Sequence, residues 1–306
     1  MSRSQMELEL IDELSGYKKK IIADAGKAWE SCDFTVSEPN LVRSFAMDQG
    51  KGVDYLNSTL ASNFNLAQNR YVLKFAAAFT HQRPYVRRKS SNVQLRKGTN
   101  PTEQCELADL GFISVFVDCN KTVIASRSTF FQAKKEECID NLTQQWLYDF
   151  DDGFEYRHSS FWELTNCVSP IRDFPDWSEG RSTAFQYLLL LDSKKVRVRL
   201  SPWKVDHTHD FGFFFYRLLT LGAGVSYLPA DSKAGGFSSI VNDVLRMASG
   251  HMAGKGRGSI DLDKVVDFFN DFREHEKYFA DSPSGEGFPM FIAIMQDTDR
   301  RLKAEN

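Results

Sequence analysis

The stretch 105–135, which reads CELADLGFISVFVDCNKTVIASRSTFFQAKK, decides the fold that we predict. Two apolar runs, 110–117 and 123–131, flank a turn-prone tetrad, Asp-Cys-Asn-Lys. The second run is rich in Val, Ile, Thr and Phe, which favour strands. Asn120 in the tetrad tolerates the positive φ that a tight turn needs. The pattern therefore predicts a β-hairpin whose two strands are largely buried.

Polar residues gather at the open end of this hairpin. With a two-residue loop at Asn120 and Lys121 and no bulge, counting outward places Asp109 opposite Gln132. Opposed residues on one face of a sheet have Cβ atoms about 5 Å apart. Lys134 points the same way as Gln132, because side chains alternate along a strand. We therefore expect a carboxylate, a carboxamide and an ammonium to converge at the open end of the hairpin. Charged groups beside buried strands usually have a partner or a function.

An acid at the head of one strand, followed by a hairpin and Gln-x-Lys at the end of the next strand, resembles the PD-(D/E)xK nuclease superfamily. The similarity is to the Gln-x-Lys variant of Mrr-like restriction enzymes and bacterial defence nucleases. Asp109 matches the first acid, Gln132 stands where Glu is common, and Lys134 matches the lysine. No proline precedes Asp109, which is a second departure from the common pattern. Such sites usually add an acid from an upstream helix, for which the candidates are Glu106, Glu30 and Glu38.

The resemblance implies hydrolysis of phosphodiester bonds in DNA, or in RNA, with Mg²⁺ or Mn²⁺. Asp109 and Gln132 would ligate the cation, Lys134 would act at the phosphate, and Glu106 would assist. A bound divalent cation neutralises the phosphodiester charge and lowers the pKa of a bound water. Mg²⁺ keeps several waters, so one or two protein carboxylates suffice. The implied role is bacterial restriction or antiphage defence, where such a subunit often works with a partner protein that senses invasion.

Two other interpretations stay open. The first is a catalytically silent protein of the same fold, which binds nucleic acid or protein within a defence complex. The 25 Phe residues and the net charge of −3 favour it. The second is a zinc protein built on His207 and His209, whose i, i+2 spacing places both side chains on one side of a strand.

The most basic stretch of the chain, 83–97, lies just upstream of Glu106. It predicts a loop that follows a phosphate backbone, and a solvated surface loop is the alternative. His81, which precedes this stretch, is a further candidate for the active site, although a lone His is more often structural. A Gly-rich tract, 249–258, predicts a flexible loop that contacts nucleic acid through Lys255 and Arg257. The nucleic-acid-binding candidates are Arg83, Arg87, Arg88, Lys89 and Lys135.

Composition sets the class of protein. A chain of 306 residues with 42% hydrophobic and 26% charged residues is ordinary for a soluble globular protein. The negative net charge counts against a large DNA footprint but leaves room for a local basic surface. Five cysteines with irregular spacing predict reduced thiols in the cytoplasm. The N-terminus lacks a signal-peptide pattern and no stretch is apolar enough to span a membrane, so we expect no membrane association.

The remaining elements complete an α/β or α+β fold with a mixed central sheet of the restriction-endonuclease-like type and a more helical C-terminal third. Residues 1–200 are predicted to form a nuclease-like core with N-terminal helices, and 201–306 a mostly helical part packed on it, or one continuous domain with it. The sequence leaves the number of copies open. The acidic loop 149–155 is predicted to be a solvated turn. Predicted helices cover 5–31, which Gly16 can divide, 40–67, 136–148, 211–221, 237–247 and 261–279; predicted strands cover 71–79, which we place beside the hairpin, 184–192, 196–200 and 290–295.

Overall fold

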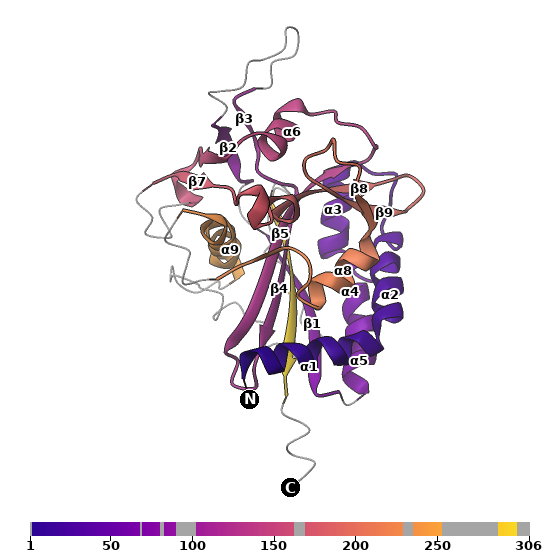
Figure 1. Cartoon of the computed structure of the whole chain (residues 1–306). Coiled ribbons are helices and arrows are strands. Elements are labelled where there is room, and N and C mark those ends of the chain that lie inside the picture. The colour runs from indigo at the N-terminus through magenta and orange to yellow at the C-terminus, as the bar shows by residue number, and fades with distance from the viewer. Residues whose placement is uncertain are drawn as a thin grey trace.

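The structure, a computed structural model, describes residues 2–67, 69–79, 83–89, 102–161, 169–228, 235–252 and 287–298. His81, Lys97, Lys255, Arg257 and the predicted helix 261–279 lie outside these ranges. The architecture is a large mixed sheet flanked by helices, as predicted (Figure 1). No helix in the part of the chain that the structure describes combines the length and the apolar character that a membrane crossing requires.

The central sheet has the strand order β1-β12-β4-β5-β8-β9-β10, and the short β11 pairs with β5. β12 runs parallel to β4, and β5 runs parallel to β8, while the other neighbours are antiparallel. The strands are β1 (Tyr71–Phe79), β4 (Leu110–Val117), β5 (Val123–Lys134), β8 (Phe185–Leu190), β9 (Val196–Leu200), β10 (Thr208–Asp210), β11 (Val225–Ser226) and β12 (Pro289–Asp297).

The last strand of the chain occupies an inner position of this sheet. β12 lies between β1 and β4, so the prediction that β1 pairs directly with the hairpin is wrong. Nearly every residue of β12 is buried, whereas the described side chains of β1 alternate along most of its length between buried and half-buried. A strand that is apolar on both faces is suited to an inner position, and an alternating strand to an edge. Residues 1–200 and 201–306 consequently share one sheet.

The hairpin β4–β5 has the register that we predict at its open end. Leu110 pairs with Phe131, as the counting requires. The turn, however, is one residue longer than predicted, because the backbone N–H of Asp118 donates to the carbonyl of Thr122 at 2.9 Å. An irregularity between Phe116 and Val117 compensates for this extra residue. The positive φ, 67°, falls on Lys121 and not on the neighbouring Asn.

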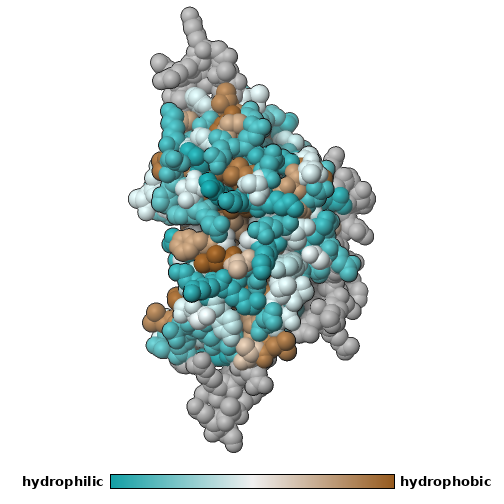
Figure 2. Space-filling view, turned by 90° about the vertical axis from the view of Figure 1, so that its right-hand side faces the viewer, coloured by the Kyte–Doolittle hydropathy of each residue, from teal (hydrophilic) through white to brown (hydrophobic). Residues whose placement is uncertain are grey.

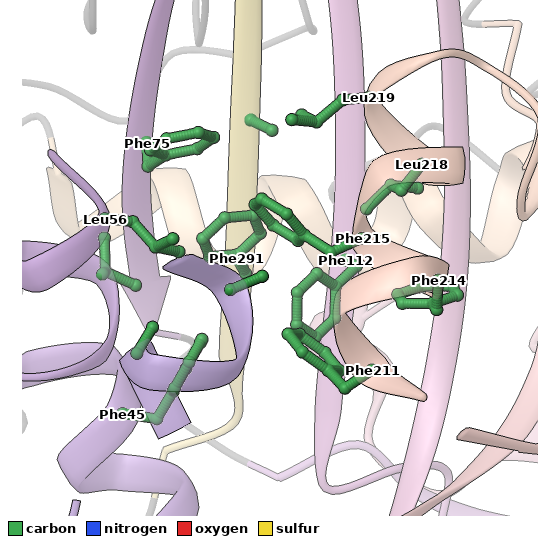
Figure 3. Close-up of a cluster of buried hydrophobic side chains, with 14 of the residues drawn as sticks. Phe45, Leu56, Phe75, Phe112, Phe211, Phe214, Phe215, Leu218, Leu219 and Phe291 are labelled. Carbon is green, nitrogen blue, oxygen red and sulfur yellow. The ribbon is translucent and has the colours of Figure 1, made fainter. Parts of the chain in front are cut away.

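Helices bury one face of the sheet with an aromatic cluster (Figure 3). The ring of Phe291 on β12 lies 4.8 Å from Phe112, 5.8 Å from Phe75 and 5.7 Å from Phe215, measured between centroids. The high Phe content therefore serves a large core, as predicted. The helices on this side are α1 (Arg3–Gly16), α2 (Lys18–Glu30), α3 (Glu38–Met47), α4 (Gly52–Leu56), α5 (Ser62–Leu66) with the π-helix η1 (Asn57–Ala61) before it, and α8 (Phe211–Leu219).

The opposite face is covered by α6 (Leu142–Asp149), α9 (Phe237–Met252) and a second, four-stranded sheet. The strands of this second sheet lie in the order β3-β2-β6-β7, and the sequence did not predict it. α6 begins at Leu142, later than predicted, because Asn141 caps it by accepting hydrogen bonds from the next turn. The strands are β2 (Tyr85–Arg88), β3 (Gln104–Glu106), β6 (Gly153–Tyr156) and β7 (Ile171–Asp173), and the short helices are η2 (Ser159–Phe161), η4 (Trp177–Glu179) and α7 (Arg181–Ala184).

The outer surface is mostly polar on the side that Figure 2 shows. Figure 2 shows the side of the molecule on which α2 lies, where hydrophilic residues predominate and hydrophobic ones form small separate groups. This distribution agrees with a central sheet whose apolar residues face the two layers that cover it.

Candidate active site

Asp109 immediately precedes β4 and is fastened to β5. Its backbone N–H donates to the carbonyl of Phe131 at 2.8 Å, which extends the hairpin ladder by one bond. Its carboxylate accepts a hydrogen bond of 2.9 Å from the backbone N–H of Ala133. The acid is therefore held beside the strand segment that carries Gln132 and Lys134, as the predicted register requires.

Gln132 lies on β5 where this strand pairs with β8, and its side chain is completely buried. Its amide nitrogen donates to the backbone carbonyl of Gln144 at 3.4 Å. Within the described residues, its side-chain oxygen accepts no hydrogen bond. A buried acceptor without a partner costs about 1–3 kcal/mol. This oxygen is consequently an acceptor that is free to coordinate a cation.

Lys134 is 4% exposed, and two neighbours hold its ammonium. Nζ donates to Oε1 of Gln144 at 3.1 Å and forms an ion pair with the carboxylate of Asp140 at 3.2 Å. Gln144, on the first turns of α6, thus contacts both polar residues of the Gln-x-Lys segment. Asp140 belongs to no sequence pattern that identified it.

Glu38 is the upstream acid that lies with this group. It is the first residue of α3, which packs against β5 and β12. Its carboxylate lies near the backbone N–H of Lys135, directly after β5. Burial and the negative charge of Asp109 raise the pKa of Glu38 to about 8, although the charge of Lys134 opposes them. Glu30, the other helical candidate, ends α2 at an exposed position.

The pKa of Asp109 is also raised, to about 6. Burial is the main cause, and the charge of Glu106 adds to it, while Lys134 and the Ala133 N–H act in the opposite direction. A bound cation would stabilise the ionised form of each of these two carboxyl groups, Asp109 and Glu38.

Glu106, on β3 of the second sheet, has a different position from the one we predicted for an assisting acid. Its carboxylate accepts hydrogen bonds from the guanidinium of Arg83 at 2.7 Å and from the hydroxyl of Tyr85 at 3.1 Å. These two donors engage the same oxygen, so the carboxylate is already used to orient Arg83. Glu106 and Asp109 nevertheless line one pocket.

Two of the five basic candidates have partners within the fold. Arg88 is buried and pairs with Asp151 at 2.7 Å. The ammonium of the half-buried Lys135 donates to the backbone carbonyls of Phe34 and Val36 at 2.6 and 2.7 Å, which ties the α2–α3 connection to the end of β5. A guanidinium buried with such a partner is unavailable to a ligand at the surface, which argues against the predicted contact of Arg88 with phosphate.

The other three basic candidates reach the surface and pair with acids there. Arg83 pairs with Glu106, Arg87 lies 3.7 Å from Glu155, and Lys89 lies 2.6 Å from Asp173. The Arg87 pair joins the neighbouring strands β2 and β6, and the Lys89 pair links the residue after β2 to β7. Exposed pairs of this kind are weak and can exchange for phosphate.

The acidic loop 149–155 is not a solvated turn. Asp149 is buried and accepts hydrogen bonds from the hydroxyl of Tyr187 and the backbone N–H of Trp203, both at 3.0 Å. Asp151 is the buried partner of Arg88. These carboxylates are structural, because each has donors that compensate for its burial.

The side chains gathered at this end of the hairpin offer oxygen atoms, whereas zinc sites use mostly Cys and His. Among the described residues, no group of three or more His, Cys, Asp or Glu side chains could hold a metal ion. The rings of His207 and His209 do lie together, 4.3 Å apart, but no third such ligand joins them in that part of the chain. Asp109, Glu38 and Gln132 each carry a side-chain oxygen, the ligand type that Mg²⁺ and Mn²⁺ prefer.

Comparison with known proteins does not identify this site. No protein-family model matches the chain, and no curated protein or solved structure matches it either.

Proposed function

We propose that the chain is a nuclease that depends on Mg²⁺ or Mn²⁺ and hydrolyses phosphodiester bonds in DNA, or in RNA. One observation carries the proposal: two carboxyl groups with raised pKa values, Asp109 and Glu38, share the end of a buried hairpin with the unpartnered oxygen of Gln132 and the ammonium of Lys134. An unpaired buried acceptor together with acids of raised pKa is more typical of a functional site than of a purely structural one.

Each residue has a role in this proposal. Asp109, Glu38 and Gln132 would hold the cation, which supplies charge neutralisation at the phosphate and a more acidic bound water. Lys134 would place its positive charge where negative charge develops on the phosphate. Gln144 orients that ammonium through its side-chain oxygen. A role in bacterial restriction or antiphage defence, with a partner protein that senses invasion, follows from the resemblance to Gln-x-Lys nucleases.

The burial of Lys134 favours a second candidate. An ammonium that is 4% exposed and already paired with Asp140 has to move to reach a substrate. If it never moves, the protein is a catalytically silent member of the same fold that binds nucleic acid or another protein.

A cleavage assay separates the two candidates. Purified protein is incubated with plasmid DNA, linear DNA and single-stranded RNA, each with Mg²⁺, with Mn²⁺ and with EDTA. We expect cation-dependent cutting that Lys134→Ala and Asp109→Asn reduce at least about 100-fold, the usual loss for a group that stabilises transition-state charge. Lys204→Ala, at an exposed position to which the proposal assigns no role, is the control and should cut normally.

Two results would count against the active site. Cutting that survives Lys134→Ala contradicts the role of the lysine. Tight nucleic-acid binding without any cutting, in wild type and with either cation, favours the silent protein.

A further inference from the structure

A pocket beside the proposed cation site has features that the hydrolytic residues do not explain. It encloses about 380 Å³, including its opening to solvent. Asp109 lies in its wall, and α3 contributes Pro39 and Arg43, which follow Glu38 on the same helix. The segment that enters β2 contributes Arg83. The pocket is therefore continuous with Asp109 and carries two guanidinium groups.

The two arginines differ in how they are held. Arg83 is oriented by its ion pair with Glu106, which uses one terminal nitrogen of a group that has five N–H donors. Arg43 is exposed and makes no hydrogen bond or ion pair within the described residues. One guanidinium is thus preorganised at the pocket, while the other is available to close on a ligand.

The charges in the pocket favour a phosphate. The carboxylate of Glu106 is matched by Arg83, and that of Asp109 would be matched by the cation of the proposed function. Arg43, whose charge is felt by Asp48 near the end of the same helix, pairs directly with no described carboxylate and can turn its charge toward the pocket. Guanidinium groups bind phosphate oxygens through paired hydrogen bonds, and Arg is the common residue for this task.

We infer that Arg43 and Arg83 form a phosphate-binding subsite that takes the backbone phosphate next to the one that is cut. This inference rests on the proposed function, because the ligand is a nucleic acid whose scissile phosphate lies at Asp109. The subsite sets the register of the strand: with one phosphate held by the arginines, the neighbouring one reaches the acids.

The test measures binding separately from cutting. Fluorescently labelled oligonucleotides are titrated with wild type, Arg43→Ala, Arg43→Lys and Lys19→Ala in Ca²⁺, which supports phosphate contacts without promoting hydrolysis in most nucleases of this chemistry. Lys19→Ala removes an exposed cation from α2 and is the matched control. Circular dichroism of each variant confirms that it is folded, as expected for exposed positions.

We expect Arg43→Ala to weaken binding about 10-fold, the loss expected for charge-assisted hydrogen bonds to one phosphate. The slope of log Kd against log salt should fall by about 0.9 for duplex DNA. The affinity of Arg43→Lys should lie between those of wild type and Arg43→Ala, because lysine keeps the charge but cannot form the paired hydrogen bonds of a guanidinium. Lys19→Ala should bind as wild type does.

Oligonucleotides that carry one neutral methylphosphonate at successive positions locate the contact. Wild type should lose affinity at the position next to the cleavage site, and Arg43→Ala should be insensitive to the substitution there. Equal sensitivity in both proteins, or equal binding by Arg43→Ala and wild type, overturns the subsite while cleavage by wild type leaves the proposed function intact. Position-specific binding without cutting supports the subsite and contradicts hydrolysis. Absence of any nucleic-acid binding overturns both.

Discussion

The carboxylate of Asp109 accepts a hydrogen bond of 2.9 Å from the backbone N–H of Ala133, the residue between Gln132 and Lys134. This single contact joins the start of β4 to the end of β5 at the place where their ladder ends. It holds the acid beside the Gln-x-Lys segment without any contribution from the turn at the other end of the hairpin. The carboxylate of Asp109 is therefore positioned before any cation binds.

The unpartnered oxygen of Gln132 gives a prediction about stability and metal binding. In metal-free protein, Gln132→Leu should leave the free energy of unfolding unchanged or raise it by up to about 1 kcal/mol, because it removes an unsatisfied buried acceptor. The same change should weaken Mn²⁺ binding at least about 10-fold, as measured by calorimetry. Urea denaturation reports the first effect.

Gln186→Leu is the matched control for this change. Gln186 is equally buried on β8, but its amide donates to Thr129 and to the carbonyl of Thr183 at 2.8 and 3.0 Å. Its loss should cost about 1–3 kcal/mol and leave Mn²⁺ affinity unaltered. Equal destabilisation by the two substitutions would show that the Gln132 oxygen has a partner in solution.

The raised pKa values of Asp109 and Glu38 predict how stability depends on pH. Both values, about 6 and about 8, lie above the ordinary ones, so the folded protein binds more protons than the unfolded chain between about pH 4 and pH 8. The contribution of these groups to stability therefore falls as pH rises through that window. In EDTA we expect Tm to drop by roughly 3–5 °C between pH 5 and pH 9 from this cause.

Mn²⁺ should reverse the drop, since the cation binds the ionised carboxylates of the folded protein. Glu38→Gln, which cannot ionise, should flatten the curve above pH 6, whereas Glu30→Gln at an exposed position should leave it unchanged. A wild-type Tm in EDTA that rises steadily from pH 5 to pH 9, with no difference in Glu38→Gln, would contradict the coupling of the two acids.

The ion pair of Arg88 with Asp151 predicts a structural role for a residue in a basic stretch. Both side chains are 1% exposed, so Arg88→Met leaves an uncompensated buried charge and should destabilise the fold by about 3–5 kcal/mol. The double change Arg88→Met with Asp151→Leu should recover most of this loss. Lys89→Met, which breaks an exposed pair, should cost at most about 1 kcal/mol. If Arg88→Met weakened nucleic-acid binding without any loss of stability, the predicted contact of Arg88 with phosphate would be supported.

The inner position of β12 predicts that the end of the chain is needed for folding. Phe291→Ala removes a ring that contacts Phe75, Phe112 and Phe215, and should cost about 3–5 kcal/mol. Phe150→Ala, at a ring that is 47% exposed, should cost less than about 1 kcal/mol. Chemical denaturation measures both. Similar losses would mean that β12 does not contribute to the core as the sheet order requires.

The second sheet explains why the sequence did not predict which residues of the basic region are buried. Its strands β2, β3, β6 and β7 are each three or four residues long, too short for a periodicity that identifies them. Their formation decides which basic residues are buried, because Arg88 points inward on β2 while Arg87 points outward. The alternation could be read only once the segment was known to be a strand.

The sequence by itself determined the hairpin β4–β5, the register at its open end and the meeting of Asp109 with the Gln-x-Lys segment. These features depend on residues close in the chain, whose apolar pattern and alternation express the local geometry. That register also survived two errors in detail, since the longer turn and the irregularity at Phe116 and Val117 compensate for each other. Only the tertiary structure decided that Glu38, among the candidate acids, lies near Asp109 and Lys134, and that β12 completes the sheet. Both depend on packing between segments far apart in the chain, for which local patterns carry no information.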